Sequence, residues 1–299
     1  MPHVMVTAGV LDVAVELHGP QDGEAVILLH GFPVDVRTWD AVAPPLTAAG
    51  FRVVVPYLRG YGPTRYRDRA TPRSGQQAAL GADLLALMDA LGIGKALLAG
   101  YDWGGRAACI VAALWPERVG GLVSANGYNI QDIAGSTRPG PPEQELRYWY
   151  QWYLHTQRGA AGLEADRAAF CRLLWRLWSP TYPLGDAEYA ATAASFDNPD
   201  FVATVVQSYR HRHQAAPGDP ALEGIEALLA ARPPISVPTI VLHGEQDGVD
   251  PPANSEGAAR HFRGPFRREV VPGAGHFLPR EVPQPWVAAL RALADGQMG

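Results

Sequence analysis

One short stretch, GYDWG at residues 100–104, constrains the fold of this chain more than any other. The apolar run at 96–99 before it predicts a short buried strand, and residues 105–114 after it predict a helix. Glycines on both sides of the turn let backbone segments approach more closely than side chains would allow. This order of strand, tight turn and helix predicts that Asp102 is held at the tip of the turn, above the sheet.

The acidic residue at this tip limits the chemistry that the turn can perform. An aspartate has a reference pKa of about 3.9, so Asp102 is ionised without help from a neighbouring base. A carboxylate is a weak nucleophile toward amides, but it can displace a leaving group from saturated carbon and form an ester with the enzyme. The substrate should then be an alkyl electrophile, such as an epoxide or an alkyl halide. The alternative is that Asp102 only caps the helix that follows.

The composition excludes several other classes of protein. The 299 residues, with 47% hydrophobic and 18% charged, fit one large α/β domain or two smaller ones. A net charge of −5 gives no reason to expect nucleic acid or an anionic membrane as a partner, and no apolar run is long enough to span a bilayer. Cys109 and Cys171 lie far apart in the sequence and do not match a metal-binding motif. We expect both to be reduced thiols in a cytoplasmic protein. The N-terminal residues do not resemble a signal peptide.

Strands and helices alternate along most of the chain, which predicts a mostly parallel sheet with helices on both faces. This core comprises residues 1–126 and 233–299. Residues 127–232 show no clear strand and contain seven of the eleven tyrosines and four of the eight tryptophans. We interpret them as an inserted helical lid, with aromatic-rich helices at 144–155 and 167–178.

A second acid and a base follow two later strands of the predicted core. Asp247 lies just beyond the strand at 237–242, and His276 lies just beyond the strand at 266–271. Because active-site groups of open α/β sheets collect at the carboxyl ends of strands, both side chains should approach Asp102. We expect Asp247 to orient His276, and His276 to activate water. We interpret His30 and His243 as braces for loops, and no metal site is predicted.

Four motifs together carry a resemblance to a known family: HGFP at 30–33, GYDWGG at 100–105, GEQD at 244–247 and GAGH at 273–276. They resemble the motif set of the α/β-hydrolase superfamily, and specifically its epoxide hydrolase and haloalkane dehalogenase branch. The resemblance implies the α/β-hydrolase fold with an eight-stranded sheet and Asp102 as nucleophile. It also implies an oxyanion hole from the backbone N–H groups of Phe32 and Trp103, with no cofactor or metal.

The predicted lid carries two further motifs that separate the activities of this branch. YQWYL at 150–154 and SYR at 208–210 resemble the two tyrosine sites of epoxide hydrolases. This implies that Tyr150 and Tyr209 hold the epoxide oxygen as it becomes an alkoxide. Dehalogenases often carry an Asn after His-Gly, whereas Phe32 stands here. Further residues expected to contact substrate are Pro33, Gln151, Trp152 and Phe277.

These motifs favour an epoxide hydrolase that acts on a small-molecule epoxide, as a monomer or homodimer, and forms a vicinal diol. Two alternatives stay open. One is a haloalkane or haloacid dehalogenase that uses the same Asp102, and each tyrosine taken singly could be an ordinary core aromatic. The other is a non-catalytic hydrolase fold that serves as a ligand receptor, against which the intact Asp102, Asp247 and His276 argue.

Overall fold

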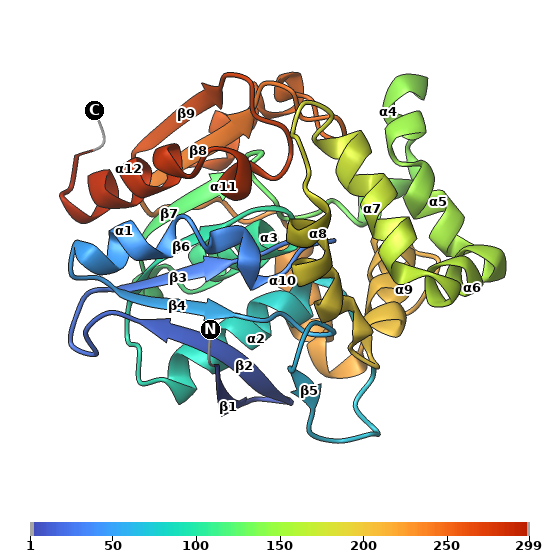
Figure 1. Cartoon of the computed structure of the whole chain (residues 1–299), viewed down its shortest axis with the longest axis horizontal. Coiled ribbons are helices and arrows are strands. Elements are labelled where there is room, and N and C mark those ends of the chain that lie inside the picture. The colour runs from blue at the N-terminus through green and yellow to red at the C-terminus, as the bar shows by residue number, and fades with distance from the viewer. Residues whose placement is uncertain (1–2, 298–299) are drawn as a thin grey trace.

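The computed structural model describes residues 3–297, which form one twisted sheet flanked by helices (Figure 1). The strand order is β1-β2-β4-β3-β6-β7-β8-β9. Strand β2 pairs antiparallel with both β1 and β4, and every later pair in this order is parallel. The strands are β1 (Val4–Ala8), β2 (Leu11–His18), β3 (Ala25–Leu29), β4 (Arg52–Pro56), β5 (Arg65–Tyr66), β6 (Ala96–Gly100), β7 (Val119–Ala125), β8 (Thr239–Gly244) and β9 (Phe266–Val271). The predicted mostly parallel sheet is confirmed: all eight predicted strands are present, and β5 makes a ninth. The prediction from sequence does not include β5, a two-residue strand beside β2 that is too short to show a periodic pattern.

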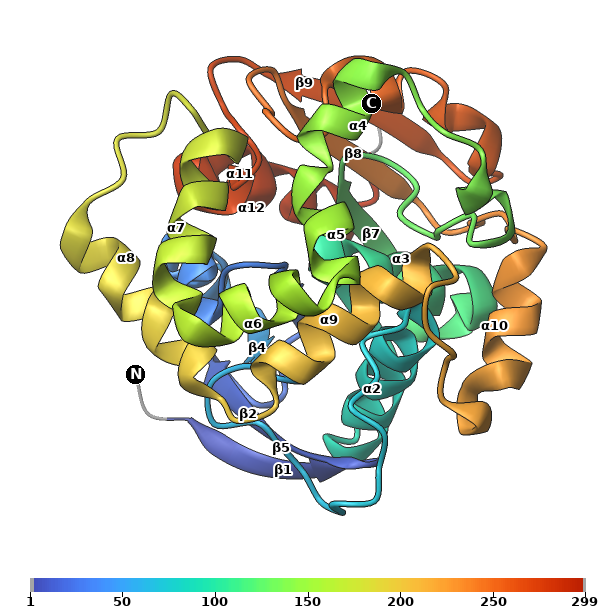
Figure 2. The same ribbon diagram turned by 90° about the vertical axis from the view of Figure 1, so that its right-hand side faces the viewer.

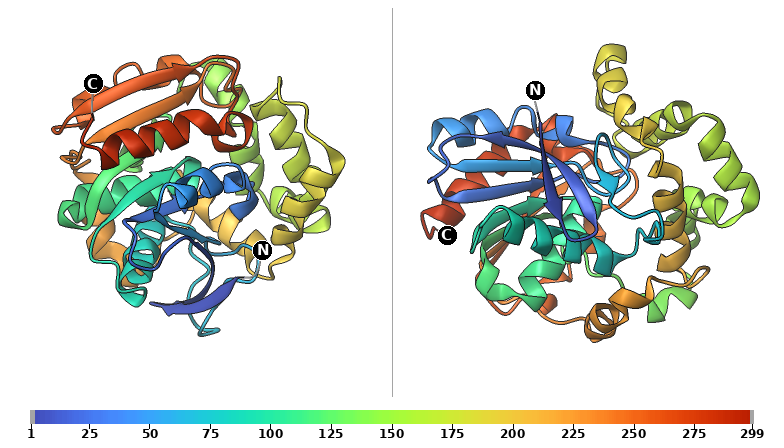
Figure 3. Two further views of the ribbon diagram at one scale, coloured as in Figure 1. Left: turned by 60° about the vertical axis from the view of Figure 1, so that its left-hand side comes forward. Right: turned by 90° about the horizontal axis from the view of Figure 1, so that it is seen from below.

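Helices cover both faces of this sheet, as the alternating pattern predicts. On one face α2 (Gln77–Ala90) packs against α3 (Asp102–Leu114), and on the other lie α1 (Ala43–Ala48) and α12 (Pro283–Ala294), blue and red in Figure 3. The short helix α11 (Leu278–Glu281) precedes α12. Strands β3, β6 and β8 are buried along their whole length, so they form the centre of the core.

The segment between β7 and β8 is helical, and no strand occurs within residues 127–232, all of which the structure describes. Its helices are α4 (Pro142–Arg147), α5 (Trp149–His155), α6 (Gln157–Ala165), α7 (Arg167–Trp178), α8 (Asp186–Ala193), α9 (Phe201–Arg212) and α10 (Glu223–Ala230). The helix predicted at 167–178 is confirmed as α7. The single helix predicted at 144–155 is wrong, because the chain breaks at Tyr148 into α4 and α5.

Most of these helices stand over the carboxyl ends of the parallel strands, where the arrows of Figure 1 point. Helix α5 packs on α6 and α9, whereas α10 contacts α2 of the core (Figure 2). Seven short 3-10 turns complete the described elements: Val36–Trp39, Pro116–Arg118, Ala134–Thr137, Ala194–Asp197, Pro220–Leu222, Pro252–Ser255 and Ala258–His261.

Polar contacts fix the lid to the loops of the core. The Trp175 indole N–H donates to the carbonyl of Pro33 at 2.7 Å. The carbonyl of Trp178 accepts from the backbone N–H groups of Gly248 at 2.9 Å and His276 at 3.2 Å. Helix α7 is therefore attached to the same loops that carry the predicted acid and base. Within residues 3–297, no helix combines the length and apolar character that crossing a bilayer requires.

Candidate active site

The turn before α3 is as tight as the sequence predicts. Asp102 has a φ of 50°, in the left-handed region that a non-glycine residue adopts at a cost of about 1–3 kcal/mol. A Cβ on Gly104 would lie 2.2 Å from the carbonyl oxygen of Leu29, and one on Gly31 would lie 2.6 Å from Asp102 Cβ. No side chain fits at either glycine. Helix α3 consequently begins at Asp102 itself, three residues before the predicted start.

The Asp102 carboxylate is held by the loop after β3. The backbone N–H of Phe32 donates to Asp102 Oδ1 at 2.7 Å, and its role in an oxyanion hole stays a prediction. The ring of Trp103, the next residue, stacks on the Phe32 ring at 5.9 Å. Asp102 also lies at the N-terminus of α3, where the helix dipole favours a negative charge. The role of the Trp103 N–H in an oxyanion hole stays a prediction.

The predicted acid and base meet as a buried pair. His276 Nδ1 donates to Asp247 Oδ2 at 2.7 Å. Burial opposes a charge on His276, but the Asp247 carboxylate outweighs this and raises the pKa of His276 to about 9. The charge of His276 in turn lowers the pKa of Asp247 despite its burial. His276 Nε2 is buried without a hydrogen-bond partner in the described part of the chain, so it is free to meet a ligand in the cavity that it lines.

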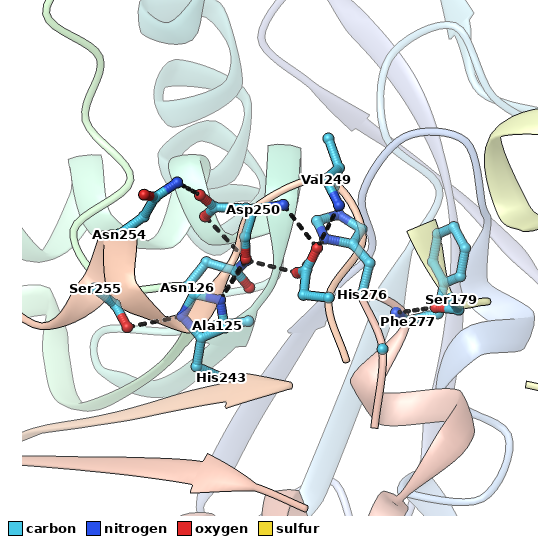
Figure 4. Close-up of polar contacts among 12 residues, drawn as sticks. Ala125, Asn126, Ser179, His243, Val249, Asp250, Asn254, Ser255, His276 and Phe277 are labelled. Atoms are coloured by element: carbon cyan, nitrogen blue, oxygen red, sulfur yellow. Dashed lines mark hydrogen bonds and ion pairs between the residues drawn. The ribbon is translucent and has the colours of Figure 1, made fainter. Parts of the chain in front are cut away.

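A hydrogen-bond network behind this pair fixes the acid (Figure 4). Asp247 Oδ1 accepts from the backbone N–H groups of Val249 at 2.9 Å and Asp250 at 2.8 Å. The Asn126 amide donates to Asp247 Oδ2 at 2.9 Å and to Asp250 Oδ2 at 3.0 Å. Burial and the nearby Asp247 raise the pKa of Asp250. The network places Asn126 on the acid and not on His276, in agreement with the interpretation that Asp247 orients the base.

The two histidines interpreted as loop braces have that role in the structure. His30 Nε2 accepts from the backbone N–H of Leu58 at 3.0 Å, and burial lowers the pKa of His30 to about 4. His243 lies 2.7 Å from Ser255 Oγ and 2.6 Å from the carbonyl of Asp250. Both imidazole rings therefore contact groups of neighbouring loops and hold those loops in place.

The lid brings its two predicted tyrosines together over the core. The rings of Tyr150 and Tyr209 meet edge to face at 5.2 Å, and both pack on Phe32. Burial raises the pKa of both phenols, so each remains a protonated donor at neutral pH. Tyr150 lines the same cavity as Asp102 and His276, whereas its hydroxyl accepts from the Gln151 amide at 2.8 Å.

None of the other predicted contact residues, Pro33, Gln151, Trp152 and Phe277, lines the cavity that holds Asp102 and His276. Phe277 is buried against Trp175 at 4.8 Å, and Gln151 supports Tyr150 from behind. Trp152 does not reach the cavity: it is 36% exposed and its ring lies 4.4 Å from that of His213. Residues two apart on a helix point in different directions, so the inward position of Tyr150 on α5 turns Trp152 outward.

A cavity of about 70 Å³ joins the two halves of the site. Several of its residues are absent from the prediction, although Arg106 follows Asp102 by four positions and therefore shares its face of α3. Arg212 likewise follows Tyr209 by three positions on α9. No group of three His, Cys, Asp or Glu side chains within residues 3–297 is arranged to hold a metal ion. The lining residues are Asp102, Arg106, Asn126, Asn129, Tyr148, Tyr150, Trp178, Arg212, Val249, Asp250 and His276.

Comparison with known proteins finds relatives of the same fold. The family model described as alpha/beta hydrolase fold matches residues 24–281. The crystal structure of a candidate epoxide hydrolase from Klebsiella pneumoniae shares 44% sequence identity, covers 98% of this chain and 97% of that chain, and superposes with a TM-score of 0.95.

Two relatives from Mycobacterium tuberculosis are also similar in sequence. Epoxide hydrolase B is 34% identical over 191 residues, which are 59% of this chain and 51% of the relative. Epoxide hydrolase A is 27% identical over 316 residues, covering 93% of this chain and 92% of the relative. The match thus spans about half the length of epoxide hydrolase B, and nearly all of epoxide hydrolase A.

Proposed function

Because the chain belongs to the α/β hydrolase fold family and to its epoxide hydrolase branch, we propose that it hydrolyses an epoxide to a vicinal diol through an ester on Asp102. The observation that carries this proposal is the pairing of two buried tyrosines, Tyr150 and Tyr209, whose ring centroids are 5.2 Å apart. Tyr150 lines the same cavity as Asp102. An epoxide oxygen stays on the product and needs such donors, whereas a halide leaves as a free anion.

In the first step Asp102 attacks a ring carbon of the epoxide. Oδ1 is held by the Phe32 N–H, which leaves Oδ2 as the attacking oxygen. The Oδ2–carbon bond forms as the ring carbon–oxygen bond breaks. Tyr150 and Tyr209 donate hydrogen bonds to the ring oxygen, and one of them transfers its proton to the developing alkoxide.

In the second step His276 activates water. Its unpartnered Nε2 takes a proton from the water, whose oxygen bonds to the ester carbonyl carbon of Asp102. The negative charge collects on Oδ1, on which the Phe32 N–H already donates, with the Trp103 N–H as the expected second donor. Collapse breaks the bond to Oδ2, and the departing diol oxygen takes the proton from His276. The regenerated Asp102 carboxyl returns its proton to the tyrosinate.

The charge on Asp102 also affects the pKa of His276, and this charge changes between the two steps. Asp102 is one of the carboxylates that raise the pKa of His276. When Asp102 becomes a neutral ester, that contribution is lost and the imidazole is more easily deprotonated. A larger fraction of His276 is therefore neutral, and able to accept a proton from water, when a base is required.

Isotope labelling in a single turnover tests the proposal. With excess enzyme in water enriched in oxygen-18, the first diol should carry an unlabelled oxygen from Asp102, and the label should appear in the protein. Label entering the diol directly from water in that turnover would contradict the covalent route. A substrate panel of styrene oxide, an aliphatic epoxide and a bromoalkane separates epoxide hydrolysis from dehalogenation.

The setting of the enzyme is part of the same proposal. We place it in the cytoplasm as a monomer or homodimer, with residues 127–232 as the lid and residues 1–126 and 233–299 as the core. Cys109 and Cys171 are both free, buried thiols, which is typical of a reducing compartment. Sedimentation of the purified chain would decide the oligomeric state.

A further inference from the structure

Two arginines line the catalytic cavity without a carboxylate partner. Arg106 comes from α3 and is only 6% exposed, and Arg212 comes from the end of α9 and is half-buried. Within residues 3–297, no carboxylate oxygen lies within 4.0 Å of either guanidinium. Arg106 Nε is buried with no hydrogen-bond partner in the same residues. Two cations therefore face one small cavity.

The neighbours of these arginines do not neutralise them. With its amide oxygen turned toward the arginines, Gln131 accepts from Arg106 Nη2 at 3.3 Å and from Arg212 Nε at 3.0 Å. An amide oxygen carries no net charge, and a guanidinium has five N–H donors to satisfy. Arg212 also lies over the ring of Tyr148 at 5.5 Å. Burial lowers the pKa of Arg106, and the charge of Arg212 adds to this effect although Asp102 opposes it.

Another buried arginine, outside this cavity, shows how this protein holds a guanidinium of purely structural role. Arg59 is 3% exposed and meets Asp83 through two bonds, Nε to Oδ2 at 2.6 Å and Nη2 to Oδ1 at 2.7 Å. Its Nη1 donates to the carbonyl of Ser74 at 2.6 Å. A buried charge costs several kcal/mol unless it is paired in this way. Arg106 and Arg212 lack that pairing, which indicates that a ligand completes it.

Asp102 offsets only part of the charge of these two arginines. It lines the same cavity and attracts both guanidinium groups. When ring opening esterifies Asp102, the negative charge moves to the tyrosinate of Tyr150 or Tyr209, which attracts both arginines as well. Asp102 and then the tyrosinate supply one negative charge against two arginines, and an anion on the substrate would supply the second.

On these grounds we propose that the substrate is an epoxide bearing a carboxylate, and that Arg106 and Arg212 bind that carboxylate. This inference rests on the proposed function and narrows it to one substrate class. Arg106 lies one helical turn from Asp102, so the carboxylate should be attached at or next to the ring carbons. A guanidinium matches a carboxylate in geometry as well as charge.

The position of Arg212 also suits the capture of an anion. Arg212 and Tyr148 line both the catalytic cavity and a larger outer pocket beside Trp152 and Arg138. A ligand that enters from the outer pocket meets Arg212 before it reaches Asp102. The arginine can thus draw a carboxylate inward and orient the ring toward the nucleophile.

The test compares two probes of nearly equal shape, oxirane-2-carboxylate and oxirane-2-carboxamide. In the wild type, kcat/KM should favour the carboxylate by about 10- to 100-fold, the value of one or two charge-assisted hydrogen bonds. In Arg212→Gln and Arg106→Gln this preference should fall at least tenfold, and Arg212→Lys should keep part of it. Arg158→Gln, at an exposed arginine of lid helix α6, is the matched control for the loss of one positive charge and should keep the preference.

A second measurement needs no variant. Thermal melting of the wild type with the product-like 2,3-dihydroxypropanoate should show tighter binding, by at least tenfold, than with its neutral amide. This keeps the inference testable if Arg106→Gln does not fold.

The outcomes separate the inference from the proposed function. If the wild type opens the carboxamide as fast as the carboxylate, the substrate class is wrong while epoxide hydrolysis stands. Equal binding of the charged diol and its neutral amide would likewise overturn the substrate class alone. If neither oxirane nor styrene oxide yields a diol, the proposed function itself is overturned, and the inference falls with it.

Discussion

The sheet and the lid each supply half of the candidate active site, and they hold their side chains in different ways. Asp102 and Asp247 are fixed by backbone: a left-handed turn and one N–H bond for Asp102, and two N–H bonds for Asp247. Tyr150 and Tyr209 are fixed by ring packing on each other and on Phe32. Backbone geometry is set locally, whereas ring packing depends on how whole helices dock. The sheet half should therefore supply the nucleophile and the base, and the lid half should supply the donors that decide which leaving group is accepted.

The largest effect is expected from removing the base in the sheet half. His276→Gln leaves Asp102 free to attack, because a carboxylate needs no base, but water is no longer activated. Turnover should fall on the order of 10⁴-fold or more while the ester accumulates. Intact-mass analysis after epoxide addition should show the protein plus one substrate.

A matched double variant controls this result. Adding Asp102→Asn to His276→Gln should abolish the adduct. An unmodified mass in His276→Gln, with Asp102 intact, would contradict the division of roles between nucleophile and base.

The next effect concerns the acid behind the base. Asp247→Asn should slow hydrolysis of the ester by roughly 10³- to 10⁴-fold and slow its formation far less, because the amide favours the wrong tautomer of His276. The base acts in its neutral form, so in the wild type the hydrolysis rate should rise with pH. Beside a charged Asp102 the pKa of His276 is about 9. In the ester Asp102 is neutral, so the midpoint of the rate profile should lie below that value. Asp247 raises that pKa, so the midpoint should move to lower pH in the variant. Stopped-flow measurement of ester decay across pH checks both points, and near wild-type decay would overturn the assignment of Asp247.

This contrast between sheet and lid also explains what the sequence could predict. Asp102, Asp247 and His276 were predictable because glycine-rich turns after buried strands bring them to one edge of the sheet. The lid tyrosines could be identified only through a resemblance to a family. Arg106 and Arg212 were not predicted. Helical spacing would have placed Arg106 on the same face of α3 as Asp102. The position of Arg212 could not be predicted, because the direction in which α9 faces is set by tertiary packing. Trp152 was misplaced because the motif around Tyr150 does not by itself show how α5 is rotated.

A smaller effect is expected from the lid donors. Tyr150→Phe and Tyr209→Phe should each slow ring opening, and the double variant should slow it by roughly 10²- to 10³-fold. Two donors on one oxygen partly substitute for each other, so the double variant should lose more than either single one. Any turnover of a bromoalkane should be spared, because bromide leaves without a proton. Pre-steady-state measurement of ester formation distinguishes the two substrates.

Tyr153→Phe offers the control on the same helix. Tyr153 lies on α5, but its ring stacks on Phe170, away from the cavity, so ring opening should be unchanged. Epoxide opening at the wild-type rate in the Tyr150 and Tyr209 double variant would break the comparison, since the lid half would then have no chemical role.

The smallest effect tests the attachment of the lid itself. Ser195, in the turn at Ala194–Asp197, donates to Asp35 Oδ2 of the core at 2.6 Å. Burial raises the pKa of Asp35 to about 6, and the Ser195 hydrogen bond opposes that rise. Ser195→Ala should therefore raise this pKa further and cost about 1.5–3 kcal/mol at pH 8, where Asp35 is charged and loses a donor. As pH falls below 6 the carboxyl is protonated in both proteins, so the deficit should shrink.

Thermal melting at pH 8 and pH 5 measures this difference. A deficit of a few °C is expected at pH 8 and a smaller one at pH 5, with kcat/KM within about twofold of the wild type because Ser195 is absent from the cavity lining. Ser236→Ala, at an exposed serine of the core, should melt as the wild type does at both pH values. A deficit that is equal at pH 8 and pH 5 would mean that the lid is held at this point by packing alone, and that its polar contact with Asp35 contributes nothing.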